Sequence, residues 1–168
     1  MKSNVILIEG IDILDRTKIA KKLAFELNIP LIQIKTLKTV AKRRIFEEMA
    51  YVFNQTLLQF KTFSYVVDEG PLNSIIMSQL HHRKSKLDYI YPLMKELNPI
   101  IIYLTTSKLS RLFKASGFTS ETMRIFKSYT KFFKTQQLFK VIEIDLFDLK
   151  INEVVMLILT QLKDVEQT

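Results

Sequence analysis

The feature that most constrains this chain is a regular alternation of short apolar runs with longer amphipathic segments. Five runs are rich in Val and Ile, as strands buried on both faces of a sheet should be. They cover residues 5–9, 31–34, 63–67, 100–104 and 141–145. Because segments with helical spacing separate them, the pattern predicts a parallel sheet with right-handed crossovers.

The connecting segments carry apolar residues at helical spacing and end at residues that stop helices. They predict helices over residues 17–27, 72–79, 87–97, 107–115, 120–134 and 151–162, with a long helical segment over about 36–60. Ser120 is the expected N-cap of its helix. No linker, repeat or low-complexity tract interrupts the pattern. We therefore expect one α/β domain over residues 1–168, with a five-stranded parallel sheet between two layers of helices.

Composition removes several function classes. The 168 residues include no Cys and only two adjacent His, so a disulfide framework and a cysteine nucleophile are excluded, and a histidine-based hydrolase is disfavoured. The apolar run near the N-terminus is short and is followed too early by a charged residue for a signal peptide. No apolar run of 18 residues occurs, as a membrane-spanning helix would need. We expect an intracellular, cytoplasmic protein that does not engage a membrane.

The charge balance favours a polyanionic partner. The chain has 25 basic and 17 acidic residues, a net charge of +8, which suits nucleotides or nucleic acid. An A+T-rich coding sequence enriches Lys in the same way, so the excess has a second, compositional explanation. Two basic clusters could form a nucleic-acid footprint or could be solvated faces. They comprise Lys35, Lys38, Lys42, Arg43 and Arg44, and residues 81–86.

Residues 10–17 follow the first predicted strand and precede a helix, which is the place of a phosphate-binding loop of the pattern G-x-x-x-x-G-K-[ST]. Gly10 and Thr17 fit that pattern, whereas Asp15 replaces the second glycine and Arg16 replaces the lysine. Asp tolerates left-handed backbone angles, so the loop shape is expected to survive, although a carboxylate repels phosphate unless a cation neutralises it. The other interpretation is an ordinary strand-to-helix turn.

Residues 5–30, VILIEGIDILDRTKIAKKLAFELNIP, resemble the opening of the thymidylate kinase and deoxynucleoside kinase group of P-loop proteins. The segments VVDEGPLNSIIMSQL, NPIIIYLTTSKLSRLFK, FTSETMRIFKSYTKFF and KVIEIDLFDLKINEVVMLILTQL resemble later parts of the same families, in the same order. The resemblance covers residues 5–162. It implies a three-layer P-loop kinase-like fold, ATP and Mg²⁺ as cofactors, a nucleotide substrate and a homodimer formed through helices that flank the sheet.

The resemblance also implies residue roles on the phosphate side of the site. Gly10, Asp15, Arg16 and Thr17 take the positions of the phosphate-binding loop, where Arg16 stands for the catalytic lysine. The hydroxyl of Thr17 matches the group that coordinates magnesium. Arg16 keeps the positive charge but presents a wide planar fork in place of a compact ammonium. The motif is therefore a degenerate Walker A loop.

On the acceptor side, Asp12 and Asp68 match carboxylates that orient the acceptor nucleotide and take part in catalysis. Glu69 stands where the families have an arginine that holds substrate phosphate. Either Arg43 or Arg44 corresponds to a phosphate-binding arginine of the long second helix. These replacements remove cationic donors from a reaction that depends on them.

A short lid is expected over about residues 111–121, with Arg111 and Lys114 as its cations. In the families, lid arginines neutralise the charge on the transferred phosphoryl group. Thr105 replaces the aspartate that ends the fourth strand, and Lys38, Lys42 or Lys114 could compensate for the lost cations.

Two functions follow from this resemblance. The first is a (deoxy)nucleoside monophosphate kinase that transfers phosphate from ATP to a nucleotide such as dTMP. The second is a catalytically degenerate protein of the same fold that binds a nucleotide or a partner, nucleic acid included. A cationic floor at residues 10–17 favours the first, whereas a loop filled by Leu14 or Asp15 favours the second.

Overall fold

The computed structural model describes residues 5–11, 14–33, 51–52, 55–57, 59–60, 62–81, 87–114 and 118–166. Its strands are β1 (Val5–Glu9), β2 (Leu31–Gln33), β3 (Tyr65–Asp68), β4 (Ile100–Thr105) and β5 (Val141–Asp145). Its helices are α1 (Arg16–Leu27), α3 (Leu72–Leu80), α4 (Ile90–Leu97), α5 (Leu109–Lys114), α6 (Ser120–Thr135) and α7 (Ile151–Glu166). Each predicted strand is present.

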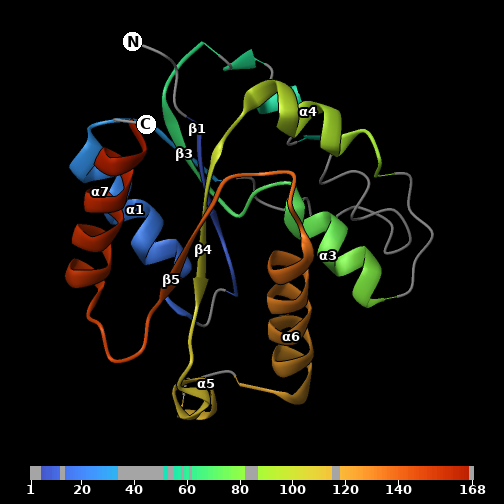
Figure 1. Cartoon of the computed structure of the whole chain (residues 1–168), viewed down its shortest axis with the longest axis vertical. Helices are drawn as coiled ribbons and strands as arrows, with labels where there is room; N and C mark the ends of the chain where they lie inside the picture. The colour runs from blue at the N-terminus through green and yellow to red at the C-terminus, as the bar shows by residue number, and fades with distance from the viewer. Residues whose placement is uncertain are drawn as a thin grey trace.

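The strands form one parallel sheet in the order β2-β3-β1-β4-β5. Helices cover both faces: α1 packs with α7 on one face, and α3 packs with α6 on the other (Figure 1). The predicted three-layer α/β fold is therefore confirmed. Because the strands are parallel, their carboxyl ends meet at one edge of the sheet, where ligands of such folds bind.

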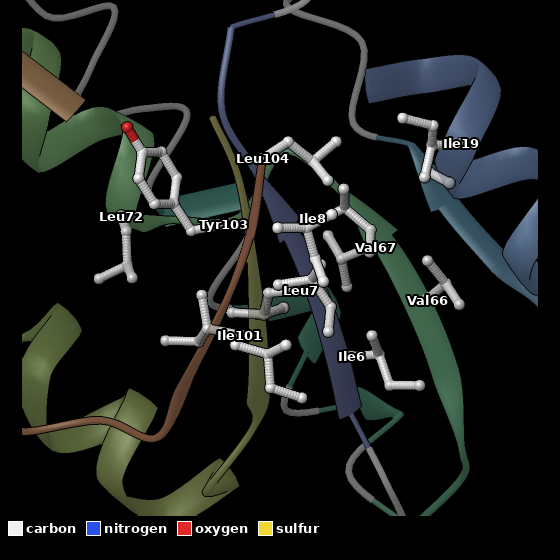
Figure 2. Packing of buried hydrophobic residues seen from close by; sticks show 14 of the residues in the cluster. Ile6, Leu7, Ile8, Ile19, Val66, Val67, Leu72, Ile101, Tyr103 and Leu104 are labelled. Atoms are coloured by element: carbon white, nitrogen blue, oxygen red, sulfur yellow. The ribbon is translucent and has the colours of Figure 1, made fainter. Parts of the chain in front are cut away.

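The core lies on both faces of the central strands (Figure 2). Every residue of β1 is buried, since β1 lies between two other strands and is covered by helices above and below. On α1, the buried residues Ile19, Ala20, Leu23 and Ala24 form a stripe that faces the sheet. Asn28, in a left-handed conformation, ends this helix.

The third strand begins later than predicted. Phe63 is 60% exposed, and its backbone N–H donates to the carbonyl of Phe60 in a turn. Pairing with β1 starts at Tyr65 and continues to Asp68, which lies opposite Ile8. The apolar run predicted the strand, but its register with β1 decides where it ends. That register is what makes Asp68 part of the sheet.

The prediction that Ser120 caps its helix is wrong. The N-cap is Thr119, whose hydroxyl accepts a hydrogen bond from the backbone N–H of Thr122 at 3.1 Å. The backbone N–H of Thr119 donates in turn to the hydroxyl of Thr122 at 3.2 Å, which completes a capping box. Both residues are Thr, so the S/T-x-x-E/Q signature does not reveal it.

Other differences are at element ends. Residues 87–89 form a turn before α4, and α5 starts two residues later than predicted. The long helical segment over about 36–60 lies mostly outside the described residues, although residues 51–52 and 55–57 are helical. Within the described ranges, none of the helices is both long and apolar enough to cross a membrane.

Candidate functional site

Polar residues gather where β1, β2, β3 and β4 end. Gly10 follows β1, Gln33 ends β2, Asp68 ends β3 and Thr105 ends β4. The interiors of these strands are apolar, so the polar groups are confined to one edge of the sheet. This edge is the candidate functional site.

The loop between β1 and α1 has two backbone conformations that set its path. Gly10 has φ +136°, and a Cβ atom added there would lie 2.7 Å from the carbonyl oxygen of Leu104, so only glycine fits. Asp15 precedes α1 in a left-handed conformation, with φ 61° and ψ 22°. Asp15 thus holds a left-handed conformation, which glycine adopts without strain. Its carboxylate accepts a hydrogen bond from Lys18 at 2.7 Å, so a cation already neutralises it.

Arg16, at the first position of α1, is 6% exposed and sits among acceptors. Its Nη1 donates to the carbonyl of Gly10 at 2.6 Å, its Nε to Asp68 at 2.9 Å and its Nη2 to Glu69 at 3.0 Å. Burial opposes the positive charge, but Glu69 and Asp68 outweigh it and raise the pKa of Arg16 above its ordinary value. The guanidinium is therefore charged and held by the protein.

Asp68 connects the loop to the neighbouring strands. Its Oδ2 accepts hydrogen bonds from the hydroxyl of Thr17 and from the amide of Gln33, both at 2.7 Å. Burial works against ionisation, but these two bonds and the charge of Arg16 outweigh it and lower the pKa of Asp68. A hydroxyl beside an ionised carboxylate is a set of hard oxygen donors of the kind that Mg²⁺ prefers.

Glu9, the last residue of β1, carries a carboxyl group that is fully buried. Neither of its side-chain oxygens makes a well-aligned hydrogen bond within the described part of the chain. Burial, and then the charge of Glu69, raise the pKa of Glu9 to about 8, while Arg16 and the backbone N–H of Gly70 act in the opposite direction. Glu9 is therefore neutral at pH 7.

Gly70 makes room for this buried carboxyl group. A Cβ atom added at Gly70 would lie 2.5 Å from Oε1 of Glu9 and 3.2 Å from Cδ1 of Leu7. Leu7 and Glu9 are two residues apart on β1 and so lie on the same face of the sheet.

Glu69 adopts a left-handed conformation with φ 69° between Asp68 and Gly70. Its Oε2 accepts from Arg16 at 3.0 Å, and its Oε1 accepts from the side-chain amide of Asn73. Asn73 in turn accepts a hydrogen bond from the hydroxyl of Tyr129 at 2.6 Å. A line of polar groups thus runs from α6 through α3 to the start of α1.

Five of the residues assigned from the sequence lie together at this edge. They are Gly10, Arg16, Thr17, Asp68 and Glu69. Asp15 lies beside them at the start of α1, and Leu14, which was considered as a residue filling the loop, belongs to the hydrophobic core instead.

The other assigned residues are elsewhere or lie outside the described residues. Lys114 is exposed on α5, which also contains Arg111. The residues outside the described ranges are Asp12, Lys35, Lys38, Lys42, Arg43, Arg44, residues 82–86 and residues 115–117.

Sequence reasoning missed five residues of the site. They are Glu9, Lys18, Gln33, Asn73 and Tyr129. Glu9 had a signal, because a carboxylate ending an otherwise apolar buried strand needs an explanation. Gln33 could be placed at the site only from the topology, since Asp68 is 35 residues away. Asn73 is four residues from Glu69, but its other partner, Tyr129, is 56 residues away.

Magnesium would need further ligands. The described residues contain no group of three or more Asp, Glu, His or Cys that could hold a metal ion. Thr17 and Asp68 nevertheless fit Mg²⁺ that a nucleotide brings with it, because this ion keeps several waters and takes few protein ligands.

The strand order and the glycine-led loop before α1 define the class of fold: this chain has the fold of the P-loop nucleotide kinases. No family model matches the chain, and no curated protein matches its sequence. The fold is therefore recognised by comparing structures, although the sequence similarity is low.

Solved structures match over nearly the whole chain. Deoxyadenosine kinase from M. mycoides, with dCMP and dCDP bound, has a TM-score of 0.70 at 18% identity, covering 95% of this chain and 99% of that chain. Thymidylate kinase from Candida albicans has a TM-score of 0.69 at 14% identity, with 98% and 93% covered. The YorR protein of Bacillus subtilis, in complex with phosphorylated GDP, has a TM-score of 0.68 at 15% identity, with 98% and 99% covered.

Proposed function

We propose that this chain binds (deoxy)nucleoside phosphates at the carboxyl edge of its sheet and is a (deoxy)nucleoside monophosphate kinase, which transfers a phosphoryl group from ATP to a nucleotide such as dTMP. The observation that carries the proposal is the backbone of the β1–α1 loop. Gly10 and Asp15 adopt the positive φ values that let this loop lead into the N-terminus of α1. A helix N-terminus presents unpaired N–H groups and a positive dipole to an anion.

The roles follow from the residues at that edge. The loop backbone and Arg16 would contact phosphate, while Thr17 and Asp68 would hold the magnesium ion that accompanies ATP. That ion would neutralise charge on the phosphates. Asp12 and Asp68 are proposed to orient the acceptor nucleotide.

The remaining assigned residues complete this proposal. Glu69 and one of Arg43 and Arg44 belong to the acceptor side, and Arg111 and Lys114 to the transferred phosphoryl group. The structural neighbours support a nucleotide ligand, because solved structures of this fold hold dCMP, dATP and phosphorylated GDP.

A second function, nucleotide binding without turnover, is favoured by the position of Arg16. Its guanidinium is buried against Asp68 and Glu69, so the same N–H groups cannot hold a phosphate at the same time. Phosphoryl transfer relies on positioned cations, and the loss of one arginine in such a site costs about 10³-fold or more in rate.

Calorimetric titration with ATP–Mg²⁺ and with dTMP, followed by a coupled assay of phosphoryl transfer, separates the two functions. A kinase binds both nucleotides and turns over, and Thr17→Val lowers its turnover about 100-fold while Thr17→Ser, which keeps the hydroxyl, does not. Binding without turnover, with turnover gained in Arg16→Lys, identifies the second function. If neither nucleotide binds, both proposals are overturned.

A further inference from the structure

A hydrogen-bond chain, buried at Tyr129 and Asn73 and partly exposed at Glu69, joins helix α6 to the first residue of α1. The hydroxyl of Tyr129 donates to Oδ1 of Asn73 at 2.6 Å, and Nδ2 of Asn73 donates to Oε1 of Glu69. The other oxygen of Glu69 accepts from Arg16. Tyr129 and Asn73 are 2% and 7% exposed, so water does not readily replace the bond between them.

The direction of each bond in this chain is determined. An ionised carboxylate only accepts hydrogen bonds, so the group of Asn73 that faces Glu69 must be its NH₂. The carbonyl of the same amide then faces Tyr129, whose hydroxyl must donate. Asn73 therefore has one orientation, and it fixes one oxygen of Glu69.

The backbone of Glu69 has an unfavourable conformation, and the carboxylate of the same residue is held in one position. Glu69 is one of the residues with positive φ, at 69°, a conformation that is unfavourable for a side chain longer than Asn or Asp. Its hydrogen bonds to Arg16 and Asn73 offset that strain. The carboxylate is thus held from two sides while its backbone is constrained.

The guanidinium of Arg16 is held from three sides, by Gly10, Asp68 and Glu69. Two of these three acceptors, Gly10 and Asp68, have a further role in the structure. The carbonyl of Gly10 belongs to the loop, and Asp68 also accepts from Thr17 and Gln33. Glu69, the third acceptor, is itself held by the side-chain amide of Asn73.

We infer that Glu69 is a positioning residue, kept in place by Asn73 and Tyr129, that holds Arg16 on the protein side of the site and so limits its access to phosphate. The inference rests on the proposed binding of phosphate at the β1–α1 loop. A phosphate must displace Glu69 from Arg16 before it can bind the guanidinium. The apparent affinity for phosphate is therefore the intrinsic affinity multiplied by the fraction of molecules in which Arg16 is not held by Glu69. Helix α6, which carries Tyr129, thereby influences the phosphate site from the opposite face of the sheet to α1.

The first test is a double-mutant cycle with inorganic tripolyphosphate and Mg²⁺ as the probe, measured by calorimetry at low salt. Glu69→Gln should tighten binding about tenfold, because it weakens a partly buried, charge-assisted hydrogen bond to Arg16. In an Arg16→Met background the same change is expected to tighten binding less than about threefold, because only direct repulsion by the carboxylate remains. Equal effects in the two backgrounds overturn the inference.

The second test needs no ligand and compares two tyrosines of one aromatic cluster. The rings of Tyr103 and Tyr129 lie 6.5 Å apart between centroids, and the hydroxyl of Tyr103 bonds to Thr130 at 3.0 Å and not to Asn73. Tyr129→Phe and Tyr103→Phe therefore each remove one buried hydroxyl, but only the first interrupts the chain to Arg16.

The readout is the Nη2–Hη2 signal of Arg16 in an ¹⁵N NMR spectrum, because Nη2 is the donor that faces Glu69. Tyr129→Phe is expected to shift this signal and to speed its exchange with water at least about threefold, while Tyr103→Phe leaves it at the wild-type position. An unchanged signal in Tyr129→Phe, or equal changes in both variants, overturns the inference. If the signal responds as expected but no variant binds tripolyphosphate, the proposed function fails, and Arg16 is held for a structural reason only.

Discussion

Replacing Glu9 with Gln tests the buried carboxyl group at the end of β1. Gln has the same shape and cannot ionise, so Glu9→Gln removes the cost of placing a carboxylate in the core. The pKa of Glu9 is raised from 4.5 to about 8, and each unit of pKa corresponds to about 1.4 kcal/mol. Between about pH 5 and pH 8, wild-type protein should therefore lose roughly 3 kcal/mol of stability through this group.

The direction of this effect follows from proton counts. Between pH 4.5 and pH 8 the folded chain keeps a proton on Glu9, and the unfolded chain has released it. The folded state binds more protons, so the free energy of unfolding falls as the pH rises. At about pH 5 or below, wild-type protein and Glu9→Gln should differ little, and near pH 8 the variant should be more stable.

The assay is urea unfolding at several pH values. Glu143→Gln, on the exposed side of β5, is the matched control and should leave the pH dependence unchanged. If Glu9→Gln and wild-type protein keep the same stability difference from about pH 5 to pH 8, Glu9 is not a neutral buried acid in the folded state. The argument from its burial is then refuted.

Three further substitutions test local features of the fold. Gly10→Ala should destabilise the chain by roughly 2 kcal/mol or more in urea unfolding, because its Cβ meets the carbonyl of Leu104 at 2.7 Å; a change below about 0.5 kcal/mol would contradict this close approach. Asp15→Gly should stabilise the chain by up to about 1 kcal/mol in thermal unfolding, because glycine adopts the left-handed conformation without strain. The exposed ion pair between Asp15 and Lys18, which this substitution removes, contributes little. A loss of stability would show that the ion pair matters more than the backbone conformation. Thr119→Ala should cost about 1 kcal/mol and Ser120→Ala almost nothing, and the reverse order would restore Ser120 as the N-cap.

Much of the fold is predictable from the sequence because it depends on local patterns. The runs at residues 5–9 and 141–145 coincide with β1 and β5, since a continuous Val- and Ile-rich segment has few alternatives inside an α/β domain. Helix α1 follows from its apolar stripe and from Asn28. The strand ends are less predictable, as at Asp68, because pairing with β1 decides them.

The partners of Arg16 could not be predicted from sequence. Asp68 and Glu69 are 52 and 53 residues away, and only the parallel pairing of β1 with β3 brings them together. The sequence indicated a lost lysine and a lost arginine, but not that their replacements would bind each other. Tyr129 is more distant still, and its hydroxyl reaches the site only because α6 packs with α3.

The central claim is that a nucleoside phosphate binds where β1 leads into α1. The most direct measurement is a titration of the ¹⁵N-labelled chain with ATP–Mg²⁺ and then dTMP, followed through the backbone amide signals. The account predicts the largest shifts at Gly10 and at residues 14–18, which surround the N-terminus of α1. Saturation with no shift there, or shifts confined to other parts of the chain, would contradict it.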